Sequence, residues 1–197
     1  WVVDSNAGKI LRIDQATNSV VNTIDITNSA LTGIAAGEGA VWVSSVDFLL
    51  SKVDPATNSV TAKVKVEGNP SSICVAEGSV WVTVSPFNTL WRINPSSNEV
   101  IAKIPVGKGS NGIAAGQGAI WVISSTEGTV SRVDPATNEV AATFAAGKKP
   151  SGIAFAYGSL WISDKDSDAV LRIDPASNNV TATISVEGGP ADIAADR

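Results

Sequence analysis

A repeat of 40 residues is the feature that most constrains the fold of this chain. The motif RVDPATNEV, residues 132–140, has four close relatives, which begin at Arg12, Lys52, Arg92 and Arg172. The five starting positions are evenly spaced at 40 residues. A fixed period of about 20 to 50 residues is typical of solenoids, propellers and other repeat architectures, in which each repeat is one small supersecondary unit. We therefore interpret the 197 residues as five copies of one such unit.

Each repeat predicts four short strands. A second landmark, in which small residues lead through a Gly-containing turn to a Trp, occupies residues 33–43, 72–82, 112–122 and 152–162. Clusters of Gly, Pro, Asn and Asp bound the β-rich runs, which is typical of strands and not of helices. The small residues of the first strand suit an innermost position. The fourth strand alternates, as at 60–66, and should lie outermost with one face in water.

The predicted fold is all-β, a five-bladed β-propeller of four-stranded antiparallel blades forming a single domain over 1–197. Four blades would span about 33–71, 72–111, 112–151 and 152–191, and the fifth would combine 192–197 with 1–32. The C-terminal ADIAADR matches a first strand and the N-terminal WVVDSN matches a second strand. We expect these two segments to pair and close the ring. The alternative is a fragment of a larger ring.

The pair of landmarks GIAAGEGAVWV and VSRVDPATNEV resembles the repeat of YncE-like, YVTN-repeat bacterial β-propellers, and that of the streptogramin B lyase (virginiamycin B lyase) group. The resemblance covers nearly the whole chain but lies in the scaffold, so it is informative about fold and says little about activity. For the lyase, it implies a His general base and a Mg²⁺ ion held near acidic residues. This chain has no His, so no catalytic residue can be transferred, and we predict no lyase activity.

Composition narrows the partners. The chain has 14 Lys and Arg against 19 Asp and Glu, a net charge of -5, and no basic cluster, which argues against nucleic acid. No apolar run approaches the roughly 20 residues of a membrane-spanning helix. The single cysteine, Cys74, is interpreted as a small buried side chain. We expect no cofactor, an extracellular or periplasmic location, and a monomer, with an oligomer as the alternative.

The basic residue that opens each motif is interpreted as structural. Because it recurs in every repeat whatever the loops contain, we expect its stem to pack along the sheet against the Trp of the second strand, with its charged head on a nearby Asp. The recurring Trp residues are assigned to packing between repeats. Trp91 has no counterpart in the other repeats, and its role is left open.

The variable loops are the predicted binding surface. The connections between the second and third strands, and those leading into the next repeat, should share one end of the sheets, while the Gly-containing and DPATN turns share the other. Loops on a rigid scaffold commonly carry binding residues. Phe48 and Phe87 are the candidate anchors. The candidate ligand-binding residues are Asp4, Asn6, Asp47, Phe48, Phe87, Asn88, Lys108, Glu127, Lys148, Lys149, Asp164 and Asp166.

One loop suggests a metal. The sequence DKDSD places Asp164, Asp166 and Asp168 at alternating positions, as a calcium loop would, but it lacks the Gly and the final Glu of an EF-hand loop. We favour a solvated turn and expect no metal.

Three functions remain open from the sequence. The leading hypothesis is a non-enzymatic binding or protein-interaction module that recognises an unidentified protein, glycan or small molecule through its loops. The second is a metal-assisted lyase or hydrolase of the streptogramin lyase type, which the lack of His disfavours. The third is a structural subunit that assembles through the sides of its sheets. One sequence cannot show which side chains converge in space.

Overall fold

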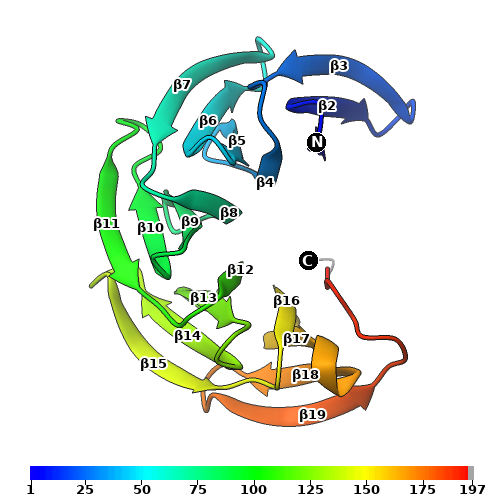
Figure 1. Ribbon diagram of the computed structural model, residues 1–197, viewed down its shortest axis with the longest axis vertical. Helices are drawn as coiled ribbons and strands as arrows, with labels where there is room; N and C mark the ends of the chain where they lie inside the picture. The colour runs from blue at the N-terminus through cyan, green and yellow to red at the C-terminus, as the bar shows by residue number, and fades with distance from the viewer. Residues whose placement is uncertain (195–197) are drawn as a thin grey trace. The chain divides into compact units, whose positions relative to one another are not determined.

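A computed structural model describes residues 1–194 as an all-β protein with four four-stranded antiparallel sheets and one three-stranded sheet. Figure 1 shows the strands of each sheet lying side by side in chain order. The strands are β1 (Val2–Asp4), β2 (Lys9–Asp14), β3 (Ser19–Asp25), β4 (Leu31–Gly37), β5 (Ala40–Ser45), β6 (Leu49–Asp54), β7 (Ser59–Lys65), β8 (Asn69–Ala76), β9 (Ser79–Ser85), β10 (Thr89–Ile93), β11 (Val100–Pro105), β12 (Ser110–Gly116), β13 (Ala119–Ser124), β14 (Thr129–Asp134), β15 (Glu139–Ala145), β16 (Pro150–Ala156), β17 (Ser159–Asp164), β18 (Ala169–Asp174) and β19 (Asn179–Ser185). The one-turn helix η1 (Lys165–Ser167) joins β17 to β18. The repeated four-stranded sheets confirm the all-β prediction and fit the blades of a β-propeller.

The described chain divides into two compact units. The first contains Trp1–Pro86 and Trp91–Ile101, and the second contains Phe87–Leu90 and the chain from Ala102 onward. Sheets β1–β3 and β4–β7 therefore belong to the first unit, and sheets β12–β15 and β16–β19 to the second. The division falls within β10 and β11.

The segment after β19 does not form the strand that the sequence predicted. Residues 186–194 carry no strand, and the sheet of β1 has three strands. The expected pairing with the N-terminal strand is not formed by residues 192–194, and the rest of that predicted strand, 195–197, lies outside the described residues. The segment does lie beside β16, because Ser151 Oγ donates a hydrogen bond of 2.7 Å to the Pro190 carbonyl.

The recurring turns have clear backbone causes. In the turns between first and second strands both central residues have positive φ, as at Glu38 (50°) and Gly39 (70°), the conformation of a type I′ hairpin. In the DPATN turns the Asn has positive φ, as at Asn58 (54°), which Asn tolerates better than most residues. The turn's Asp54 accepts the Ala56 N–H at 2.7 Å. The motif repeats because this turn requires these residues.

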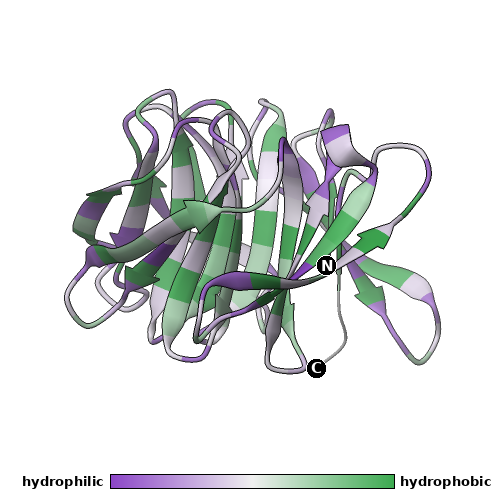
Figure 2. Cartoon of the chain, turned by 90° about the horizontal axis from the view of Figure 1, so that it is seen from below, coloured by the Kyte–Doolittle hydropathy of each residue, from purple (hydrophilic) through white to green (hydrophobic). Residues whose placement is uncertain are grey.

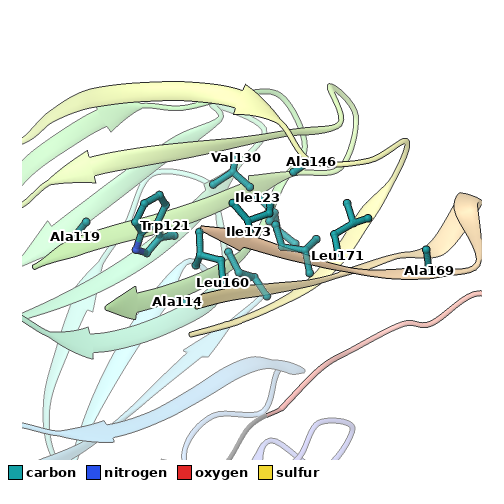
Figure 3. Packing of buried hydrophobic residues seen from close by; sticks show 12 residues of the cluster. Ala114, Ala119, Trp121, Ile123, Val130, Ala146, Leu160, Ala169, Leu171 and Ile173 are labelled. Carbon is teal, nitrogen blue, oxygen red and sulfur yellow. The ribbon is translucent and has the colours of Figure 1, made fainter. Parts of the chain in front are cut away.

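The core of each unit consists of apolar side chains between stacked sheets. In the second unit, Trp121, Ile123 and Val130 of one sheet pack with Leu160 and Ile173 of the next, as Figure 3 shows. Figure 2 shows green, hydrophobic bands running across the strands and purple segments concentrated towards their ends and turns. Burial of these bands is the main favourable term for such a fold.

The interpretation of the recurring Trp and basic residues is confirmed for the stems and wrong for the charged heads of Arg12 and Lys52. The cation lies 5.0 to 5.5 Å from the Trp ring centroid in all five repeats. Where the sequence predicted hydrogen bonds to an Asp, Arg12 and Lys52 donate to the carbonyls of Pro55 and Pro95 at 2.6 and 2.7 Å. A carbonyl is close enough here because the DPATN turn of the next repeat lies beside these two heads.

The structure also places Trp91 and Cys74, the two residues that the sequence analysis considered singly. Trp91, left open by the sequence, is only 3% exposed and packs in the cluster that includes Trp42 and Ile93. Cys74 lies in β8, opposite Trp81 of β9. Its side chain is half-buried, whereas the sequence predicted a buried side chain. Both residues belong to the scaffold.

Candidate functional site

The variable loops share one backbone frame at one end of the sheets. In every repeat, the first residue after the fourth strand donates its N–H to the carbonyl of the last residue of the loop between the second and third strands, at 2.8 to 3.0 Å. That last residue has a φ of 48° to 66° in all five copies, which are Gly8, Phe48, Asn88, Gly128 and Asp168. The backbone is constant and the side chain varies, so this end can differ in chemistry without changing the fold.

The loop 46–48 presents two apolar side chains on a fixed backbone. Val46 and Phe48 are each 43% exposed. The Val46 N–H donates to the Ala30 carbonyl at 2.9 Å, and the Phe48 N–H donates to the Ser45 carbonyl at 3.2 Å. Because its backbone groups are paired, this loop holds an exposed apolar patch in place. We call Val46 and Phe48 the apolar loop patch.

Asp47 points into the same loop. Its carboxylate accepts hydrogen bonds from the hydroxyls of Thr27, at 2.7 Å, and Ser45. Burial raises the pKa of this carboxyl, but these hydrogen bonds outweigh it, so the pKa lies below its ordinary value of 3.8. Asp47 therefore anchors the loop on which Phe48 is presented.

Phe87 is the other exposed aromatic residue that the sequence predicted at this end, with 60% of its surface exposed. The neighbouring Asn88 instead closes its own loop, because its side-chain oxygen accepts the Gly109 N–H at 3.1 Å. Asp168 makes the equivalent bond to the Gly189 N–H at 2.7 Å. Asn88 and Asp168 thus use their side chains to accept backbone N–H groups, whereas the Phe87 side chain has no hydrogen-bonding group and stays exposed.

Asp164 lies inside its loop, at 1% exposure. Its two carboxylate oxygens accept the N–H groups of Lys148 and Lys149 at 2.9 and 2.8 Å. Burial raises the pKa of this carboxyl, whereas hydrogen bonds from Ser167 and the two N–H groups lower it, and the net pKa lies below 3.8. The carboxylate is an internal cap of the loop 147–149.

The charged side chains around Asp164 remain on the surface. Lys148 and Lys149 are exposed, and Lys149 Nζ lies 4.0 Å from Asp166 Oδ1. Such an exposed pair contributes little to stability. Within residues 1–194, no group of three or more Cys, Asp or Glu side chains is placed to hold a metal ion, Asp164, Asp166 and Asp168 included.

The equivalent loop of sheet β12–β15 is built differently. Ser124 takes the place of Asp164, and a Cβ on Gly107 would lie 2.4 Å from Ser124 Oγ and 2.6 Å from Glu127 Oε2. Ser124 pairs across the strands with Ser110 and Thr129, and the three buried hydroxyls accept or donate no hydrogen bond within the described part of the chain. The loop end of this sheet therefore carries a row of polar groups without internal partners.

The remaining predicted residues are spread over separate loops. Asp4, Asn6 and Lys108 are exposed, and Asp4 Oδ1 accepts the Ala7 N–H at 3.2 Å. The structure thus groups Val46 and Phe48 in one loop and Lys148, Lys149 and Asp166 around another. It does not gather all twelve candidates into a single pocket.

Sequence reasoning missed two exposed apolar residues. Val46 is aliphatic, and the sequence signal for a loop anchor was an aromatic side chain, as at Phe48 and Phe87. Tyr157, 77% exposed with a φ of 51°, lies at the opposite end of its sheet, in the Gly-containing turn between β16 and β17. The sequence contains a signal for Tyr157, because the equivalent positions of the other repeats hold the polar residues Glu38, Glu77 and Gln117.

Comparison with known proteins adds no assignment. No protein-family model matches the chain, and no curated protein is significantly similar to it. Among the described residues, no helix has the length and apolar character needed to cross a membrane. Function is therefore inferred from the geometry of the site.

Proposed function

We propose that this protein is a non-enzymatic binding module that presents its variable loop end to a partner. The apolar loop patch, Val46 and Phe48, is the observation that carries the proposal. The partner offers a complementary apolar face, which a protein, a glycan ring or a small ligand can supply.

The conformation of Phe48 supports a role outside folding. A bulky residue with a φ of 65° is unfavourable by about 1 to 2 kcal/mol relative to an ordinary conformation. The side chain recovers little of this by burial, because it is 43% exposed. Gly or Asn occupies three of the four equivalent positions and tolerates that φ. Retaining Phe here is understandable if its ring contacts a partner.

The rigidity of the loop favours binding. Ordering a flexible side chain or loop on binding costs about 0.5 to 1.5 kcal/mol per group, and a prearranged anchor avoids much of this. Backbone pairing by Val46 and Phe48 and the hydrogen-bonded Asp47 carboxylate fix the loop beforehand. An aromatic side chain held in this way is typical of binding hot spots.

The scaffold part of the proposal is a five-bladed ring in which the C-terminal segment completes the blade of β1. Two equivalent contacts support it. Ser151 donates a hydrogen bond to the Pro190 carbonyl, and Thr32 donates an equivalent bond of 2.6 Å to the Pro70 carbonyl. The two acceptors, Pro70 and Pro190, are 120 residues apart, which is three repeats. The resemblance of the repeat to YncE-like propellers supports the propeller architecture in this proposal.

The test is a paired screen of the wild type and two variants against a glycan array and a displayed random-peptide library. The loop variant is Val46→Thr with Phe48→Asn, which removes the patch and keeps the φ of residue 48 accessible. The control is Tyr157→Asn, which removes an exposed aromatic residue with a similar φ at the other end. Wild type and control should bind the same probes, and the loop variant should bind them at least tenfold more weakly.

Two results would overturn the proposal. One is that no probe in either collection binds the wild type. The other is that the probes are lost with Tyr157→Asn and retained by the loop variant, which would move the binding surface to the turn end.

A further inference from the structure

A small cavity lies at the turn end of sheet β12–β15. It has a volume of about 210 Å³ and is lined by Gly118, Ala119, Arg132, Asp134 and Ala141. All five residues belong to the second unit. The volume is roughly that of seven molecules of liquid water, so it suits a ligand of a few non-hydrogen atoms.

Arg132 is the basic residue of its repeat, and its hydrogen bonding differs from that of its counterparts. Arg92 Nε and Arg172 Nε donate to the hydroxyls of Ser79 and Ser159 at 2.8 and 3.0 Å. The Arg132 side chain is half-buried, its guanidinium lies 5.5 Å from the Trp121 ring centroid, and this side chain makes no hydrogen bond or ion pair with any residue from 1 to 194. Its guanidinium is positioned by the ring while its five N–H donors stay available.

Two small residues in the sequence explain the difference. Ala119 stands where Ser79 and Ser159 provide the hydroxyl partner. Ala141 stands where Thr61 and Thr181 fill the space beside the third strand, each donating its hydroxyl to the carbonyl of the basic residue at 3.3 and 3.2 Å. The same sheet has lost both side chains, which removes a partner for Arg132 and opens space next to it.

We infer that this cavity binds a small carboxylic acid that also carries an amino or hydroxyl group. A guanidinium presents two parallel N–H donors that match the two oxygens of a carboxylate. Stacking on Trp121 restricts the guanidinium before the ligand arrives, which lowers the entropy lost on binding.

Asp134 sets the second requirement. One of its oxygens accepts the Ala136 N–H at 2.7 Å, and a carboxylate has further lone pairs to accept from a ligand. Its charge also disfavours a dianion such as inorganic phosphate in the same cavity. An amino or hydroxyl group next to the ligand's carboxylate meets both Arg132 and Asp134.

The inference is independent of the proposed function, because the cavity and the apolar loop patch share no residue. Its test is titration of the whole protein with glycine, L-lactate, acetate and inorganic phosphate, followed by calorimetry and by the NMR signal of the Arg132 Nε–H. Glycine or lactate should bind in the millimolar range or tighter and shift that signal. Acetate and phosphate should bind at least tenfold more weakly.

Matched variants locate the site. Ala119→Ser installs the hydroxyl that Ser159 provides to Arg172, so it should weaken binding at least tenfold without loss of stability. Arg132→Gln should abolish binding, whereas Arg172→Gln in the neighbouring sheet should leave it unchanged. The double change Ser159→Ala with Thr181→Ala should create a second site, seen as a stoichiometry of two.

The inference is overturned if neither glycine nor lactate binds, if Arg132→Gln retains binding, or if Arg172→Gln reduces it equally. Binding of phosphate as tight as that of glycine would also overturn it, because Asp134 would then have no part in selection.

Discussion

Sheets β12–β15 and β16–β19 lie in the same unit and share one register, yet their polar contacts differ at both ends. Ile113 pairs with Val122 as Ile153 pairs with Ile162. In β16–β19, Asp164 caps two backbone N–H groups and Arg172 is bonded to Ser159. In β12–β15, the side chains of the corresponding Ser124 and Arg132 make no hydrogen bond within residues 1–194.

The difference shows which interactions the fold requires. Both sheets keep the apolar stack around Trp121 and Leu160 and the same turns. A typical side-chain hydrogen bond contributes only about 1 kcal/mol net, so a sheet can lose several and still form. Sheet β12–β15 has fewer internal side-chain hydrogen bonds than β16–β19, and its polar groups without internal partners are available to a ligand. The predictions below compare the two sheets directly.

The largest effect is expected at Asp164. Changing Asp164→Ala leaves the N–H groups of Lys148 and Lys149 without their charged acceptor, and we expect a loss of about 3 kcal/mol in the free energy of unfolding. Ser124→Ala, at the equivalent position, removes a hydroxyl without an internal bond and should change stability by less than about 1 kcal/mol. Urea unfolding of both variants measures the contrast. Equal losses would show that Ser124 has a structural role as large as that of Asp164.

Acid should act through the same residue. The folded pKa of Asp164 is lower than its ordinary value of 3.8, so its contribution is fully present above about pH 4 and is lost as pH falls through the folded pKa. The pKa of Asp47 is also lowered from 3.8, so its contribution to stability is lost in acid in the same way. Between pH 6 and pH 3, the wild type should lose more unfolding free energy than Asp164→Asn does. An identical pH dependence of the two proteins would contradict this assignment.

A smaller effect is expected at the turn end. Ser159→Ala removes the acceptor of Arg172 and should destabilise the protein by about 1 kcal/mol, whereas Ala119→Ser gives Arg132 the same acceptor and should stabilise it by a similar or smaller amount. Thermal unfolding of the two variants and of the wild type gives both signs in one experiment. Stabilisation by Ser159→Ala would contradict the equivalence of the two positions.

The smallest effect concerns the loop patch in the other unit. Phe48→Asn should raise the unfolding free energy by up to about 1 kcal/mol, because Asn tolerates a φ of 65° better than Phe. The neighbouring loop residue Val46→Thr should be close to neutral for stability. A clear loss of stability in Phe48→Asn would mean that the ring contributes to folding and would remove the strain argument for binding.

The repeat allowed much of the fold to be predicted, because each landmark has a local cause. The positive φ of Asn58 and Gly39 favours those residue types, and the Trp and basic residues meet across adjacent strands of one sheet. The exposure of Phe48 and Phe87 was also predictable, since loops lie at the surface. The head of Arg12 was not, because its carbonyl partner, Pro55, belongs to the next repeat.

The sequence by itself determined the period, the strands, the turns and the end of the sheets at which variation gathers, since all of these depend on residues close together in the chain. The tertiary structure alone decided that Asp47 and Asp164 turn inward, and that Arg132 lines a cavity. Thr27 lies 20 residues from Asp47, and Lys148 and Lys149 lie 16 and 15 residues from Asp164. The partner of Arg172 is Ser159, 13 residues away on another strand, and the change of a few atoms at the equivalent Ala119 removes it. Such contacts depend on distances that a repeat pattern does not contain.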